Sequence, residues 1–166
     1  MSKAPDSPGS GGLSGKALRF QSVLDDLAPG SRVREFEKPS RTAQQAADAV
    51  GCLLNQIVKS LLLRTEDGRP VLALTAGGNR VDEEVVGGVV GSAVRMADAD
   101  FVRAHTGYAI GGVPPFGHPE RVETLVDEDL LVFDEIWAAA GTPNTVFAIA
   151  PARLLEITGG RRIRLA

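Results

Sequence analysis

The sequence Gly107-Tyr-Ala-Ile-Gly-Gly-Val-Pro-Pro-Phe-Gly-His118 is the stretch around which the rest of the chain is organised. Four of its twelve residues are glycine and two are proline. Glycine permits backbone dihedrals that other residues resist, whereas proline fixes φ, removes an N–H donor and pushes the preceding residue towards extended conformations. The stretch therefore predicts a stiff ledge of bare backbone against which a ligand can lie.

The same stretch has a plainer interpretation, a tight connection between two strands. However, ordinary turns are polar, and this one carries Tyr108, Ile110 and Phe116, with His118 at its end. We interpret it as a candidate binding loop and keep the plain turn as the alternative.

Composition indicates one globular domain with a core of its own. The chain has 166 residues, of which 43% are hydrophobic and 23% charged. The single cysteine, Cys52, excludes an internal disulfide, and two histidines are too few for a histidine metal site. We therefore expect no metal and no cofactor.

Charge and hydropathy limit the partners. No apolar run approaches the roughly 18 residues of a membrane helix, and the N-terminus lacks an apolar signal core, so we expect a cytoplasmic protein without membrane contact. The net charge of −3 argues against a general nucleic-acid coat, although Arg161, Arg162 and Arg164 form a candidate basic patch.

The chain divides into a tail and one domain. Residues 1–15 are rich in Ser, Gly and Pro and predict a disordered tail. Residues 16–166 form the domain, whose strongest strand, 56–64, turns at Asp67-Gly68 into a partner strand, 71–75. The pattern further predicts helices at 16–27, 41–50 (capped by Ser40), 81–91, 98–105 and 152–158, strands at 33–37, 94–96, 122–126 and 145–150, one or two strands within 130–139, and a short basic tail at the end.

Lys59 is the unusual residue of the strongest strand. Alternation places it on one face with Ile57, Leu61 and Leu63. A lysine among aliphatic side chains either reaches out to solvent, where it prevents edge-to-edge aggregation, or faces a cavity that holds its partner. Both interpretations stay open from this strand, and the cavity interpretation predicts that the ammonium faces the 107–118 loop.

Three segments in this order carry a family resemblance: Gln56-Ile-Val-Lys-Ser60, Gly111-Gly-Val-Pro-Pro115 and Gly141-Thr-Pro-Asn-Thr-Val-Phe147. Together they resemble the YbaK/prolyl-tRNA synthetase-associated family of aminoacyl-tRNA editing domains. That family has a lysine on a central strand, a Gly-x-x-x-Pro loop, and a third loop with Gly-x-x-His or a variant. The resemblance implies an α/β (α+β) fold, with a mixed, partly barrel-like sheet flanked by helices.

The resemblance also implies an activity, the hydrolysis in trans of a wrongly attached amino acid from tRNA. The implied partners are the acceptor end of an aminoacyl-tRNA and, in addition, an aminoacyl-tRNA synthetase. Lys59 and Gly111 would be catalytic. The implied substrate-binding residues are Ile57, Ser60, Gly112, Val113, Pro114, Pro115, Phe116, His118, Gly141, Thr142 and Asn144.

One departure from the family bears on the activity. Asn144 stands where several relatives carry histidine, and asparagine cannot act as an acid or base, although it donates and accepts hydrogen bonds. A catalytically degenerate fold that binds tRNA or an aminoacyl-like ligand is therefore an alternative, as is a domain that docks onto a synthetase. The aliphatic residues Ile57, Leu61, Leu74 and Val113 suggest a pocket for a small amino acid, such as alanine, cysteine, serine or threonine.

Overall fold

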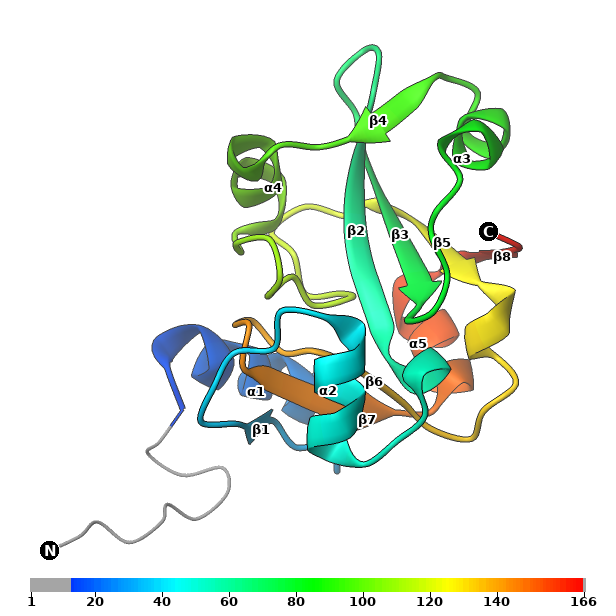
Figure 1. Cartoon of the computed structure of the whole chain (residues 1–166). Helices are drawn as coiled ribbons and strands as arrows, with labels where there is room; N and C mark the ends of the chain where they lie inside the picture. The colour runs from blue at the N-terminus through cyan, green and yellow to red at the C-terminus, as the bar shows by residue number, and fades with distance from the viewer. Residues whose placement is uncertain (1–12, 166) are drawn as a thin grey trace, which may run out of the picture.

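The computed structural model describes residues 13–165, which form two open β-sheets with helices packed against them (Figure 1). The larger sheet has the strand order β4-β2-β3-β5-β8, and the smaller sheet has the order β1-β7-β6. This is the mixed α/β architecture that the sequence predicts. The partly barrel-like closure is not present, because among the described strands the two sheets meet only at an isolated parallel bridge between Ile57 and Trp137.

The hairpin at the centre of the larger sheet matches its sequence pattern. β2 (Val58–Thr65) and β3 (Pro70–Ala76) pair antiparallel, with Lys59 opposite Thr75. Gly68 closes the turn with a φ of 86°, a left-handed value that favours glycine. Alternation along β2 places its side chains on two faces, so the strand contributes to two separate cores.

The flanking strands of the larger sheet are β4 (Val94–Met96), antiparallel to β2, and β5 (Glu123–Asp127) and β8 (Arg161–Ile163), which add in parallel beyond β3. β8 corrects the prediction of a basic tail. Its arginines are exposed and its Ile163 is half-buried, so a three-residue edge strand offers too little alternation to be recognised in sequence.

The smaller sheet is antiparallel throughout. It consists of β1 (Arg34–Glu35), β7 (Thr145–Ile149) and β6 (Ile136–Ala139). β6 is the one strand found within 130–139, and it follows a short 3-10 turn, η2 (Glu128–Leu130).

The helices begin and end close to the predicted positions. Their bounds are α1 (Gly15–Leu27), α2 (Ala43–Val50), α3 (Glu83–Val90), α4 (Ala99–Thr106) and α5 (Pro151–Thr158), with a 3-10 turn, η1 (Leu54–Gln56), before β2. The cap of α2 is Thr42, whose hydroxyl accepts from the Gln45 N–H at 3.0 Å, and not the predicted Ser40.

The predicted tail boundary at residue 15 is too late. Residues 1–12 lie outside the described residues, but Leu13 is buried in the main core. Ser14 caps α1, because its hydroxyl accepts from the Ala17 N–H at 3.3 Å. The folded domain therefore includes residues 13–15. Among the described helices, none has the length and apolarity needed to span a bilayer.

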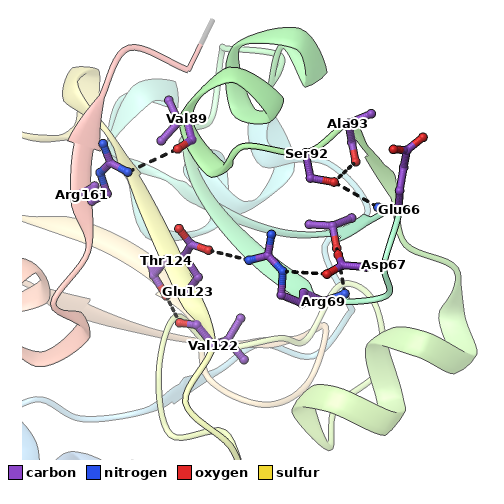
Figure 2. Close-up of polar contacts among 11 residues, drawn as sticks. Glu66, Asp67, Arg69, Val89, Ser92, Ala93, Val122, Glu123, Thr124 and Arg161 are labelled. Atoms are coloured by element: carbon purple, nitrogen blue, oxygen red, sulfur yellow. Dashed lines mark hydrogen bonds and ion pairs between the residues drawn. The ribbon is translucent and has the colours of Figure 1, made fainter.

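Polar contacts gather around the turn between β2 and β3 (Figure 2), at the opposite end of this hairpin from Lys59. Arg69 lies between Asp67 and Glu123, with nitrogen–oxygen distances of 3.4 Å to each carboxylate. Arg161 donates to the Val89 carbonyl at 3.4 Å and so links β8 to α3. These exposed pairs contribute little individually, and their effect is to connect strands that are distant in sequence.

Candidate functional site

The tip of the 107–118 loop is a tight turn. The Gly112 N–H donates to the Ala109 carbonyl at 2.9 Å, and Gly111 has a φ of 92°, the positive value that the third residue of a type II turn requires. Gly111 is exposed, and its N–H has no acceptor among the described residues. The turn therefore presents an unpaired backbone donor to solvent.

The rest of the loop is anchored by its side chains. All four residues of 113–116 are buried. The Phe116 ring lies 5.5 Å from that of Phe20 and 5.7 Å from that of Phe147, between centroids. Aromatic pairs at this separation are attractive and fix ring positions. The side chains of Val113, Pro114, Pro115 and Phe116 thus hold the ledge against the core, and only their backbone can face a ligand.

His118 contacts the backbone of the same loop through its imidazole ring. Its Nε2 lies 2.8 Å from the Pro114 carbonyl. Burial lowers the pKa of His118, and the bond to Pro114 opposes that shift. The ring borders a cavity of about 230 Å³ that lies between the loop and α5. The position of His118 indicates that it supports the loop.

The 107–118 loop packs directly on the loop that joins β6 to β7. A Cβ added to Gly112 would lie 2.9 Å from the Thr142 Cα and 3.0 Å from the Gly141 carbonyl oxygen. A Cβ on Gly141, whose φ is 111°, would lie 3.2 Å from the Tyr108 ring. Side chains at these glycines would separate the loops, so the sequence brings two of the three predicted segments together at backbone distance.

Asn144 is used to hold neighbouring backbone. Its Nδ2 donates to the Phe36 carbonyl at 2.7 Å, and the Phe36 N–H donates to the Asn144 carbonyl at 2.9 Å. Its Oδ1 accepts from the Thr142 hydroxyl at 3.0 Å, and that hydroxyl also lies 2.8 Å from the Thr145 hydroxyl. The Asn144 side chain therefore fixes its own loop against the segment after β1.

Lys59 is half-buried, and its ammonium donates to the backbone carbonyl of Asn79. Its partner thus lies in the turn after β3 and not in the 107–118 loop, where the sequence led us to expect it. Burial lowers the pKa of Lys59, the nearby Arg80 adds to this, and Asp127 opposes it. The ammonium has three N–H groups, so two are left for a substrate.

Asp127 organises the turn that contacts Lys59, and the sequence did not indicate this role. It is fully buried, and its Oδ2 accepts from the Ala76 N–H at 3.0 Å and from Asn79 Nδ2 at 2.9 Å. Its Oδ1 accepts from the Asp129 N–H at 3.0 Å. The carboxylate fixes Asn79, whose carbonyl then receives the Lys59 ammonium. A single acidic residue at the end of an apolar strand was the only available signal.

The strand β6 links Lys59 to the second loop. The bridge between Ile57 and Trp137 is parallel, and β2 and β6 lie side by side. Lys59 follows Ile57 by two residues in β2, and Ala139 follows Trp137 by two residues in β6, just before the Gly141 loop. The structure therefore joins Ile57 and Lys59 to the loop pair through β6.

The structure does not gather all of the predicted pocket-lining residues around Lys59. Ser60 points to the face of β2 opposite Lys59, and its buried hydroxyl has no partner among the described residues. The predicted aliphatic lining is divided as well, since Leu74 and Val113 belong to the main core and Ile57 packs with α2. In the described part of the chain, no group of three or more His, Cys, Asp or Glu side chains is arranged to hold a metal ion.

Comparison with known proteins shows the family of the chain. The aminoacyl-tRNA editing domain family matches residues 37–157. The uncharacterized protein YwhH of Bacillus subtilis is 35% identical over 126 residues, which cover 76% of this chain and 80% of that protein. A proline–tRNA ligase of Xanthomonas oryzae pv. oryzae is 30% identical over 122 residues, 73% of this chain but only 20% of the ligase.

Solved structures show the same fold. A candidate trans-editing enzyme for prolyl tRNA synthetase superimposes with a TM-score of 0.87 at 44% identity, over 92% of this chain and 98% of that one. The hypothetical protein APE2540 superimposes with a TM-score of 0.82 at 28% identity, over 89% and 98%.

The fold is that of an α/β domain of the editing type. The chain belongs to the aminoacyl-tRNA editing domain family.

Proposed function

We propose that this chain is a trans-acting aminoacyl-tRNA deacylase. Its substrate would be a small amino acid, such as alanine, cysteine, serine or threonine, esterified to tRNA-Pro or a related tRNA. The observation that carries the proposal is the unpaired Gly111 N–H on a turn that packs against the Thr142 loop, beside the strand of Lys59. The similarity to a candidate trans-editing enzyme for prolyl tRNA synthetase supports it.

An aminoacyl ester is already activated. Its hydrolysis therefore needs little from the protein beyond orientation of the ester and stabilisation of the charge that develops on it. Water adds to the ester carbonyl, the bond to the ribose oxygen breaks, and that oxygen takes the proton from water. The products are the free amino acid and the tRNA. In this proposal the Gly111 N–H donates to the oxygen on which negative charge develops, and the Lys59 ammonium supplies a positive point charge.

A second candidate function is binding without turnover. It is favoured by Asn144, whose amide is engaged on both its nitrogen and its oxygen within the fold. In that case the domain would hold an aminoacyl-tRNA or an aminoacyl-like ligand and leave the ester intact.

One assay separates these functions. A panel of tRNA-Pro charged with alanine, cysteine, serine or threonine is incubated with the protein in excess, and loss of the ester is followed. We expect accelerated hydrolysis of at least one member. Tight binding of the panel with no hydrolysis above the buffer rate would instead establish the binding function.

A further inference from the structure

Arg34 has an unusual setting on the exposed face of the smaller sheet. The centre of its guanidinium lies 5.4 Å from the Phe36 ring centroid and 5.3 Å from that of Trp137. The residue is nevertheless exposed. No Asp or Glu among the described residues lies within ion-pairing distance of it, whereas the neighbouring Arg32 pairs with Asp25 at 3.3 Å.

Such an arginine is prepared to bind an anion. Aromatic rings attract the face of the guanidinium and restrict its rotation, while its N–H groups point outward from the edge of the same plane. Those N–H groups match the oxygens of a phosphate or carboxylate in a two-point geometry. Because the side chain is already held, less conformational entropy is lost when the anion binds.

The strand register places Arg34 in line with Lys59. Arg34 is opposite Val146 in β7, and Val146 is opposite Ala139 in β6. Lys59 and Ala139 each lie two residues beyond the isolated parallel bridge between Ile57 and Trp137, so they lie on the same sides of their strands as the bridged residues. Residues in one row share a face, so the two cations lie on the same face, about three strand spacings or roughly 14 Å apart.

The two residues that lie between Arg34 and Lys59 in the sheet have small side chains that are only partly covered. Val146 and Ala139 are both half-buried. On one side of this row, the loop pair is attached through Asn144, which exchanges hydrogen bonds with Phe36. Arg34 therefore lies at the opposite end of the candidate site from Lys59, over the ring of Phe36, the residue whose backbone Asn144 holds.

The surroundings fit a nucleic acid better than an acidic peptide. A cleft of about 400 Å³ beside Arg34 is lined by Arg32, Trp137 and residues 148–150, with Glu135 as the one acidic residue of its lining. Trp137 is half-exposed there. Single-stranded nucleic acid is bound by aromatic faces for its bases together with cations for its phosphates.

We infer that Arg34 binds a backbone phosphate of the RNA whose 3′ end enters the Lys59 site. This inference rests on the proposed function, because it takes the RNA to be the substrate's own acceptor end. Arg34 is in this role a substrate-positioning residue, and it takes no part in the bond-breaking step.

The test uses uncharged tRNA-Pro transcript, so that binding is measured without hydrolysis. Its dissociation constant is determined by fluorescence anisotropy over a range of salt concentrations, for the full chain and for Arg34→Ala. We expect binding to weaken roughly tenfold, and the slope of log affinity against log salt to become shallower by about 0.7, the value for one phosphate contact on a single strand.

Two variants sharpen the result. Arg34→Lys keeps the charge but loses the stacked fork, so we expect the full salt slope with weaker binding. Arg95→Ala is the matched control, since it removes an exposed arginine from β4, at the opposite end of the molecule from β1, and we expect it to bind as the parent does (Figure 1).

The inference is overturned if Arg34→Ala keeps the parent's salt slope. A variant with an unchanged salt slope and a lower melting temperature would show that Arg34 is a structural residue. It is also overturned if the parent does not bind the transcript. Failure of the proposed function has a different signature, a parent that binds with the expected Arg34 dependence and hydrolyses no charged tRNA.

Discussion

Gly112 and Thr142 lie so close that a single added methyl carbon on Gly112 would come within 2.9 Å of the Thr142 Cα. The second nearest atom, the Gly141 carbonyl oxygen, is also backbone. Neither can move aside as a flexible side chain does. This contact holds the two candidate loops in register with one another.

Gly112→Ala should therefore separate the loops. We expect a loss of about 1–3 kcal/mol in the free energy of unfolding, the usual cost of overpacking, measured by urea titration. Gly88→Ala is the matched control: a Cβ there meets nothing within 4 Å, and alanine favours the helix. A Gly112→Ala protein as stable as the parent would show that the loops are free to part.

Gly111→Ala tests the neighbouring glycine differently. A Cβ at Gly111 meets nothing within 4 Å, but its φ of 92° is unfavourable for alanine. We expect a stability loss of roughly 1 kcal/mol and, because the turn carries the proposed donor, a rate loss on the order of 100-fold. Thermal melts must accompany the kinetics. Unchanged turnover on a substrate that the parent hydrolyses would make the turn a plain connection.

The elements that sequence predicted are those with local signals. Alternation and the Asp67-Gly68 turn indicate the β2–β3 hairpin. Gly51 and Pro151 mark helix boundaries by their own backbone preferences. β8 had no such local signal. It is a parallel edge strand, and its pairing with β5 stabilises it more than the preferences of its own residues do.

The sequence marks the segments that make up the candidate site, but not the contacts between them. The glycines of both loops were visible as motifs. The partner of Lys59 was not, because it is the backbone carbonyl of Asn79, and any residue type supplies a carbonyl. The role of Asp127 was hidden for a related reason, since its donors Ala76 and Asn79 lie about fifty positions earlier in the chain.

His118 predicts a pH dependence of stability. Its pKa is lowered in the folded protein, so below about pH 6.5 the unfolded chain binds more protons than the folded one. The free energy of unfolding then rises with pH through this window and is lost on acidification. We expect His118→Gln to flatten the dependence of melting temperature on pH between about 5 and 7. Parallel curves for parent and variant would contradict this account.

The domain boundary predicts a contrast between two deletions. Removing residues 1–15 takes away Leu13, which is 8% exposed, and the Ser14 cap, whereas removing residues 1–12 keeps both. We expect the longer deletion to be less stable by at least 2 kcal/mol, the low end for loss of a buried leucine. Equal melting temperatures for the two deletions would show that neither residue stabilises α1.

Lys59 is central to the proposed activity. Because burial disfavours its charge in the folded state, replacing it with alanine should leave the melting temperature nearly unchanged. The loss of a positive point charge beside the ester should, however, lower the rate of hydrolysis by roughly 100-fold or more.

The most direct test is single-turnover hydrolysis of the charged tRNA-Pro panel by the parent and by Lys59→Ala, with melts of both. The account predicts that the parent accelerates hydrolysis of at least one member, and that Lys59→Ala stays folded and falls to near the buffer rate. A Lys59→Ala protein that hydrolyses as the parent does, or a parent that leaves every ester intact, would contradict it.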